Sequence, residues 1–488
     1  MKKKLFCILL IVFLVVPFIT SCDNGKDDTS SVAVSVDQDA DFNLPKRNLG
    51  GKVIKLLTGD EASGNNYYDC EFAASESNGS AINDAVVLRT NILKETYGID
   101  LQVEFDETPA ETIKELVLSG VNTYQLVSDN LYDIAPIGMG NSFWDLNKVP
   151  SLNLENDWWD KSVVNDLSTA GYQFYLAGDL MVSDKNSTWC CFFNKDLIEQ
   201  YNLEDPYELV KNNKWTIDKL YEMGKDVSVA NQGLSNVTWE NGTFGLVTQT
   251  YDGIASMVSF NQKMITKDEN DYPLLNIENE ATYNKFTKIF DIMMDTNTSL
   301  VIELSGAPID GYYEATRTVF LSGRGLFTYN KLQYVQNILD SNVDFDYGLL
   351  PMPKYDETQD EYYTTCTVYY SQVVSIPRSV PESELEDIGY TLELLGYYGK
   401  KYVKPAYYDI TIKAQKMSDQ QSEEMLDIIF ENRIFDLASV YNYEKALYLY
   451  TGIIGSKSNS IVSTIEANAA AIQTTIDASI EQFDAIDQ

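Results

Sequence analysis

The sequence predicts an α/β fold built on a parallel sheet and divided between two domains. Residues 52–127 alternate strand-like and helix-like segments, an order typical of parallel sheets with right-handed crossovers. The chain has 488 residues, which exceeds the length at which one hydrophobic core stops growing. Its hydrophobic fraction of 44% is that of a globular protein.

The elements of this first region have clear ends. Apolar residues recur with a helical period between Ile82 and Leu93, and Gly98 ends that helix because glycine readily adopts the conformation that follows a helix. Thr108 and Pro109 open the next helix. We predict strands at 52–58, 99–105 and 124–127, and helices at 81–97 and 109–118. Ligands bind at the carboxyl ends of such strands, so the loops after residues 58 and 127 are placed to line a cleft.

The later elements are less regular. We predict strands at 172–180, 188–193, 325–328, 343–350 and 368–376, helices from about 195 and 216, a helix at 381–398, and a helical, loop-rich stretch up to about 322. Trp215 is expected to pack at a helix start, whereas Trp158 and Trp159 are expected at the surface of a lobe, with the rim of the cleft as the alternative. Apolar residues from Ile465 to Phe483 predict a terminal helix packed on a domain rather than a coiled coil.

Residues 1–21 have the composition of a secretory signal. Three lysines at 2–4 precede an apolar run at 5–20, which is shorter than a comfortable transmembrane helix. Small residues then stand directly before Cys22, and this order resembles a bacterial lipobox. The resemblance implies cleavage before Cys22 and lipidation of its thiol, whereas an ordinary signal peptide beside an incidental cysteine is the alternative. We expect a protein anchored to the extracytoplasmic face of the cell membrane.

A flexible linker is expected after the lipidated cysteine. Residues 22–50 are rich in Asp, Ser, Asn and Gly and show no hydrophobic period. At about 3.3 Å per extended residue, such a linker spans roughly 90 Å at most. One acyl chain holds a protein weakly, so we expect a multiply acylated cysteine that also carries a fatty acid such as palmitate.

Composition excludes several classes of function. The net charge of −37 repels nucleic acid, so we expect no DNA or RNA partner. The chain has no histidine, which excludes a Ser-His-Asp triad, a Cys-His pair and an HExxH zinc site. No GxxxxGK(S/T) loop and no GxGxxG fingerprint occurs. We therefore expect no cofactor, no metal and no catalytic residue, although the many carboxylates leave glycoside hydrolysis open.

The cysteines give no sign of a metal or redox site. No CxxC pair occurs, and the adjacent Cys190 and Cys191 lie in an apolar, strand-like run. We expect these two to be buried thiols rather than a vicinal disulfide. A disulfide between Cys70 and Cys366 stays open, because the sequence does not give the distance between them.

Four segments, taken in order, resemble a known family. They are FNKDL at 193–197, WTIDKL at 215–220, FLSGRGLF at 320–327 and DYGLLPMP at 346–353. Together they resemble segments of the extracellular solute-binding proteins of bacterial ABC importers, in the carbohydrate-binding branch similar to maltose-binding protein. The resemblance covers most of residues 51–400.

The resemblance implies a two-lobed, type II periplasmic-binding-protein-like fold with a ligand cleft between hinge-linked α/β lobes. The first lobe would hold 51–192 and 325–398, and the second 193–324 and 399–488. The hinges would fall near 191–194, 323–327 and 399. Ligand that contacts both lobes would favour the closed form, which a permease then receives.

The resemblance also implies candidate ligand contacts. Sugars are held by aromatic rings against their apolar faces and by polar groups on their hydroxyls, and this chain has 33 Tyr and 6 Trp. The candidates follow predicted strands or lie in the second lobe: Asp129, Asn130, Gln249, Tyr251, Asp252, Asn330 and Tyr334. Maltose-binding protein has tryptophans near the last of these positions, and this chain does not.

We therefore expect a monomeric, lipid-anchored binding protein that delivers a solute, such as an oligosaccharide, to an ABC permease, and not an enzyme. A binder of peptides or other small solutes on the same fold is the first alternative. A secreted glycan-active enzyme is the second. An outer-membrane glycan-binding lipoprotein should be nearly all helical, and the strand-like runs argue against it.

Overall fold

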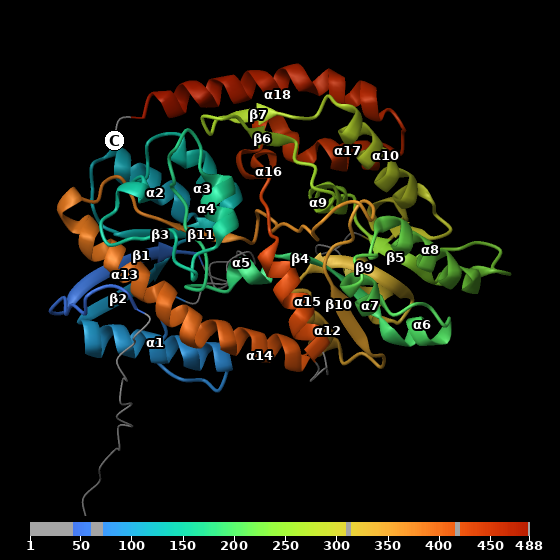
Figure 1. The fold of residues 1–488 in the computed structure, drawn as a ribbon, viewed down its shortest axis with the longest axis horizontal. Coiled ribbons are helices and arrows are strands. Elements are labelled where there is room, and N and C mark those ends of the chain that lie inside the picture. The colour runs from blue at the N-terminus through green and yellow to red at the C-terminus, as the bar shows by residue number, and fades with distance from the viewer. Residues whose placement is uncertain (1–41, 60–71, 309–313, 415–419, 487–488) are drawn as a thin grey trace, which may run out of the picture. The chain divides into compact units, whose positions relative to one another are not determined.

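Two mixed β-sheets organise the chain in the computed structural model, which describes residues 42–59, 72–308, 314–414 and 420–486. Residues Pro45–Gln488 make up one compact unit. The signal segment, Cys22 and Cys70 lie outside the described residues. Figure 1 shows the two sheets as separate groups of strands, each with its own helices.

The first sheet has the strand order β11-β3-β1-β2. It consists of β1 (Lys52–Thr58), β2 (Ile99–Phe105), β3 (Leu126–Asn130) and β11 (Gln372–Ser375). The first three strands are parallel, as predicted, and β11 adds antiparallel to β3. Helices α1 (Ala81–Tyr97) and α2 (Pro109–Leu118) have the predicted bounds, and Gly98 ends α1 in the left-handed region at φ 61°.

The second sheet has the order β10-β4-β9-β5-β8. It consists of β4 (Trp189–Asn194), β5 (Phe244–Thr248), β8 (Ser299–Val301), β9 (Gly325–Lys331) and β10 (Tyr347–Leu350). Strands β9 and β10 run antiparallel to β4, while β5 runs parallel to β8 and β9. Strands β5 and β8 lie in the stretch expected to be helical and loop-rich. They are short, and β5 contains Gly245, which permits a close approach of α8 (Ile217–Ser228) at Gly224.

The remaining elements are mostly helices around these sheets. They are α3 (Leu131–Gly138), α4 (Lys161–Leu167), α5 (Ser183–Asn186), α6 (Lys195–Gln200), α7 (Pro206–Lys211), α9 (Asp252–Ser259), α10 (Glu280–Met294), α11 (Glu314–Leu321), α12 (Tyr334–Ser341), α13 (Leu385–Tyr398), α14 (Lys404–Ala414), α15 (Gln420–Glu431), α16 (Leu437–Tyr441), η7 (Tyr443–Tyr448), α17 (Leu449–Ser456) and α18 (Ile461–Asp484), with the hairpin β6 (Ile265–Lys267) and β7 (Pro273–Leu275). The terminal helix α18 packs on β7 and η7, so it is the packed helix that the sequence predicts.

Several local predictions are confirmed. The Thr216 side chain caps α8 by accepting a hydrogen bond from the Lys219 backbone N–H, and Trp215 beside it is fully buried. Cys190 and Cys191 are free, buried thiols on β4, and Cys366 is likewise buried and free.

Among the described residues, no helix is long and apolar enough to span a membrane.

Two predictions in the middle of the chain are wrong. Residues 172–180 form no named strand and make only isolated bridges, such as the one between Leu176 and Val374 of β11. Trp158 and Trp159 are buried rather than on the surface. The Trp158 indole packs edge-on to Tyr397 of α13, and a side chain at Gly396 would collide with it.

Three segments lie side by side where the chain passes between the two sheets. Residues 187–189 lead into β4, residues 364–367 lead towards β11, and residues 432–434 join α15 to α16. Bridges pair Thr188 with Cys366 and Thr364 with Arg433.

The sheet pairings favour lobe limits that differ from the expected ones. Because β9 and β10 belong to the second sheet, they favour grouping residues 325–350 with that sheet rather than with 51–192. The expected hinge at 323–327 lies at the start of β9, within the second sheet, and not in the segments that connect the sheets. The lobe limits themselves stay a prediction.

Candidate ligand-binding site

The turn from β3 into α3 is held by the side chains of Asp129 and Asn130. The Asp129 carboxylate accepts hydrogen bonds from the backbone N–H of Ala110 at 3.0 Å and of Asn130 at 2.7 Å. Asn130 caps α3 by accepting a hydrogen bond from the Asp133 backbone N–H at 3.1 Å. Both side chains are buried. They therefore position α3, whose second residue is the half-buried Tyr132.

A similar turn leads from β5 into α9. The Asp252 carboxylate accepts hydrogen bonds from the Thr248 hydroxyl at 2.7 Å and the Gln249 backbone N–H at 2.9 Å. Asp252 is fully buried, and this burial raises the pKa of its carboxyl group to about 8. The buried acid fixes the turn and leaves Tyr251 half-buried at its tip. Gln249 itself is buried.

Aromatic side chains gather between these two turns. Trp189 and Tyr251 stack with ring centroids 6.2 Å apart, Tyr251 lies 6.3 Å from Tyr369, and Tyr369 lies 4.7 Å from Tyr132. The hydroxyls of Tyr369 and Tyr448 are hydrogen-bonded to each other. We call these five residues the aromatic cluster. It joins α3 on the first sheet to α9 on the second, two helices that Figure 1 shows on different sheets.

The aromatic cluster combines apolar faces with hydroxyl groups. Tyr132, Tyr251 and Tyr369 are half-buried, and Tyr448 is 40% exposed. Burial raises the pKa of Tyr132 and of Tyr369, so both hydroxyls stay protonated at neutral pH and can donate hydrogen bonds. Rings that are only partly covered and carry polar tips suit a ligand with both apolar and hydroxyl-bearing faces.

The two predicted residues near the end of β9, Asn330 on the strand and Tyr334 at the start of α12, divide between this region and the core. Asn330 pairs with Cys190, and the next residue, Lys331, pairs with Trp189 of the aromatic cluster. Asn330 is half-buried beside that cluster. Tyr334, by contrast, is 2% exposed and packs against Phe192 and Phe320, so it lies in the core and not with the other candidates.

Sequence reasoning found one member of the aromatic cluster, Tyr251, and missed four. Tyr132 follows the predicted turn by two residues, and its place on that turn is the signal that could have found it. Trp189, Tyr369 and Tyr448 come from segments far apart in the chain, and nothing local in the sequence brings them together.

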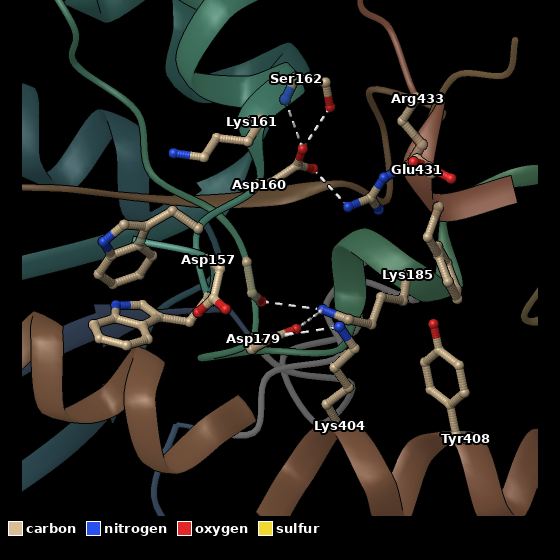
Figure 2. A pocket seen from close by; sticks show the side chains of 14 residues that line it. Asp157, Asp160, Lys161, Ser162, Asp179, Lys185, Lys404, Tyr408, Glu431 and Arg433 are labelled. Atoms are coloured by element: carbon tan, nitrogen blue, oxygen red, sulfur yellow. Dashed lines mark hydrogen bonds and ion pairs between the residues drawn. The ribbon is translucent and has the colours of Figure 1, made fainter. Parts of the chain in front are cut away.

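A second feature is a pocket of about 280 Å³ lined by charged groups, shown in Figure 2. Its lining includes Asp160 with Arg433, at 2.6 Å, and Asp179 with Lys185, at 3.2 Å. These charges pair with one another, and none belongs to the aromatic cluster. The pocket lies beside the segments that connect the sheets, to which Arg433 belongs.

No family model matches this sequence, and no curated protein matches it. Solved structures do match it at low identity. One is the maltose/maltodextrin-binding domain MalE from Bdellovibrio bacteriovorus bound to maltotriose, at 13% identity and a TM-score of 0.52, covering 88% of this chain and 100% of that one. Another is the cyclic alpha-maltosyl-1,6-maltose binding protein from Arthrobacter globiformis, at 11% identity and a TM-score of 0.54, with coverage of 88% and 100%.

A third match is an ABC substrate-binding protein from Listeria monocytogenes in complex with cycloalternan. It is 11% identical, with a TM-score of 0.53, and covers 88% of this chain and 99% of that one. At such identities the likeness concerns the fold alone. The mixed α/β chain with its two mixed sheets has the type II periplasmic-binding-protein fold.

Proposed function

We propose that this protein captures an oligosaccharide at the aromatic cluster and delivers it to an ABC transporter permease. The observation that carries the proposal is the position of the cluster. Its rings connect the turns that follow β3 and β5, the carboxyl ends at which α/β sheets bind ligands. Three similar structures are named as binders of maltotriose, a cyclic maltosyl-maltose or cycloalternan.

The residues divide the work of binding between stacking and positioning. Tyr132, Tyr251 and Tyr369 offer ring faces to a pyranose, and the tyrosine hydroxyls donate to its oxygens. Asn330 supplies a further polar group beside them. Asp129, Asn130 and Asp252 hold the two turns, and Gln249 is buried within the second turn. Tyr334 is left out because it is buried among core aromatics.

Delivery requires two lobes that close on the ligand. We assign the first lobe to the first sheet and the second lobe to the second sheet with β9 and β10, so the lobes move about residues 187–189, 364–367 and 432–434. A ligand that touches α3 and α9 together binds best when the lobes are closed, and its differential affinity sets the population of that form.

The proposed location is the outer face of the cell membrane, and the proposed partner is an ABC permease. The protein acts as a monomeric binding protein without enzymatic activity, tethered by lipid on Cys22 at the outer face of the cell membrane. The linker keeps it near its permease, which raises the local concentration of loaded protein at the transporter. No cofactor takes part.

The test is thermal unfolding of the protein with panels of oligosaccharides, peptides and polyamines. A ligand that binds only the folded state adds about 2.7 kcal/mol of stability at a hundred times its Kd, which raises Tm. We expect a rise with at least one oligosaccharide that is lost in Tyr251→Ala. The variant Tyr283→Ala is the matched control, since Tyr283 is a half-buried tyrosine of α10 outside the aromatic cluster.

Other results would reject the proposal in part or whole. A rise with peptides or polyamines and with no oligosaccharide would favour the alternative solute binder on this fold. Release of reducing ends from an oligosaccharide would favour a glycan-active enzyme.

A further inference from the structure

Three backbone segments run from one sheet, or a helix packed on it, to the other. Residues 187–189 and 364–367 each lie between strands of different sheets, and residues 432–434 join α15, which packs on β10, to α16, which packs on α3. The three segments are bonded to one another directly. The Trp189 backbone N–H donates to the Thr365 carbonyl at 2.9 Å, and the Ile434 N–H donates to the Thr364 carbonyl at 2.8 Å. The Thr367 N–H donates to the Ser187 carbonyl at 3.0 Å. Any change in the angle between the sheets must act on this bonded set of segments.

One guanidinium lies at the centre of the connecting segments. Arg433 forms ion pairs with Asp160 at 2.6 Å and with Asp184 at 3.1 Å. It also donates to the Thr188 hydroxyl at 3.2 Å and lies 3.9 Å from the Cys366 sulfur. Arg433 thus contacts a residue of each of the other two connecting segments, as well as the start of α4 and α5.

The burial of these charges makes their contacts persistent. The side chains of Arg433, Asp160 and Asp184 are all at most 6% exposed. Separating a buried guanidinium from its carboxylates leaves uncompensated charges in a poorly polar environment, which is strongly unfavourable. The paired carboxylates hold the pKa of Arg433 above its usual value, so it stays charged. Arg433, Asp160 and Asp184 therefore move as one body.

The pocket beside Arg433 supplies room for movement. It separates residues 157–162 and 178–185 from α14, which packs on α1 and α12, and from α15, which packs on β10. Across it Lys404 of α14 faces Asp179 at 3.8 Å, longer than a hydrogen bond, and the lysine side chain is 38% exposed (Figure 2). One side of Arg433 is thus tightly bonded, and the other side borders open space.

We infer that Arg433 is the pivot of the closing motion, a positioning residue that fixes the line about which the two lobes turn. The inference rests on the proposed function, because only a protein that closes on its ligand needs such a line. Loss of one carboxylate partner then loosens the connection between the lobes without touching the aromatic cluster.

The test measures the separation of the lobes in the absence of ligand. Spin labels are introduced at positions 111 on α2 and 284 on α10, both exposed, through an amino acid with a ketone side chain so that native cysteines stay intact. Distances between them are recorded by pulsed electron paramagnetic resonance for the full chain and for Asp160→Asn. Asparagine can still cap α4 at Ser162 but removes the charge that faces Arg433.

We expect the Asp160→Asn variant to broaden the distance distribution and add a second population. Asp205→Asn is the control, because Asp205 caps α7 in the same way and no ion pair of Asp205 is found within the described part of the chain. A lower Tm with an unchanged distribution would mean that Arg433 only stabilises the fold, and would overturn the inference. If Asp160→Asn does not fold, Thr188→Val is measured with the same two outcomes; it removes the hydroxyl that contacts Arg433, the Asp184 carbonyl and Cys366 but leaves the buried charges in place.

Failure of this inference can be told apart from failure of the proposed function. The distances are recorded without ligand, so they do not depend on which solute binds. A protein that binds no oligosaccharide can still show the altered distribution, and a protein that binds one can lack it.

Discussion

The rings of Tyr132 and Tyr369 lie 4.7 Å apart although 236 positions of sequence separate them. Tyr132 stands on α3, and Tyr369 stands in the segment that leads from the connecting residues into β11. Tyr369 also lies beside Tyr251, so the two contacts together connect the end of β3 with the end of β5. The aromatic cluster therefore depends on both sheets being in place.

Replacement of Tyr369 should weaken ligand binding through lost stacking. We predict that Tyr369→Ala raises Kd about fivefold or more, since an aromatic contact contributes about 1 kcal/mol. Tyr369→Phe keeps the ring and should lose less. Isothermal titration calorimetry with the oligosaccharide that raises Tm measures both, and equal Kd values for wild type and Tyr369→Ala would remove this ring from the site.

The buried Asp252 should make stability depend on pH. Its pKa is about 8 in the folded protein against a usual value of 3.8, so the folded state holds this proton more tightly. By linkage, stability from this group is complete below about pH 4 and is lost as pH rises towards about 8. Urea unfolding at pH 5, 7 and 9 should show that the Asp252→Asn variant loses less stability over this range than the wild type does. Parallel curves for the two proteins would contradict the prediction.

Gly245 should resist substitution because α8 crosses β5 at that point. A Cβ on Gly245 would lie 2.2 Å from the Cα of Gly224, a contact between backbones that cannot turn away. We predict that Gly245→Ala destabilises the protein by about 1–3 kcal/mol in urea unfolding. Gly455→Ala on α17 is the control: nothing lies within 4 Å of its new Cβ, and alanine favours a helix. Equal stability of the two variants would refute the packing explanation.

The anchor should be separable from binding. Cys22→Ala is expected to move the protein from the membrane fraction into the medium or periplasm in cell fractionation. The Kd for its solute should stay unchanged, because none of the proposed ligand contacts lies in residues 22–50. A membrane-bound variant would reject lipidation at this cysteine.

The first sheet was predictable because the hydrophobic pattern and the end residues of its elements lie within each element's own sequence. The helix over 81–97 has an apolar period and a terminal glycine, residues 52–58 are mostly apolar, and residues 99–105 alternate between apolar and polar, so the bounds of these three elements and the parallel direction of the strands follow. The third strand, predicted at 124–127, is found at Leu126–Asn130. Strands β5 and β8 were missed, since five and three residues are too few for a period to appear.

The candidate site was predictable only where the resemblance to solute-binding proteins pointed to a particular loop. Tyr251 was found from its position in the second lobe. Trp189 and Tyr448 were not, because their places depend on how distant segments pack. Asp252 was expected to touch ligand, and the structure places it beneath the turn, where its two hydrogen bonds hold Thr248 and Gln249.

The most direct test of solute binding at the aromatic cluster uses Trp189 as a reporter, since its ring stacks on Tyr251. Tryptophan fluorescence is recorded during titration of the wild type and of Trp189→Phe with oligosaccharides and with peptides. We predict a saturable change with an oligosaccharide in the wild type and a change that is much smaller in Trp189→Phe. Saturable changes with peptides alone, or equal changes in both proteins, would contradict oligosaccharide binding at this cluster.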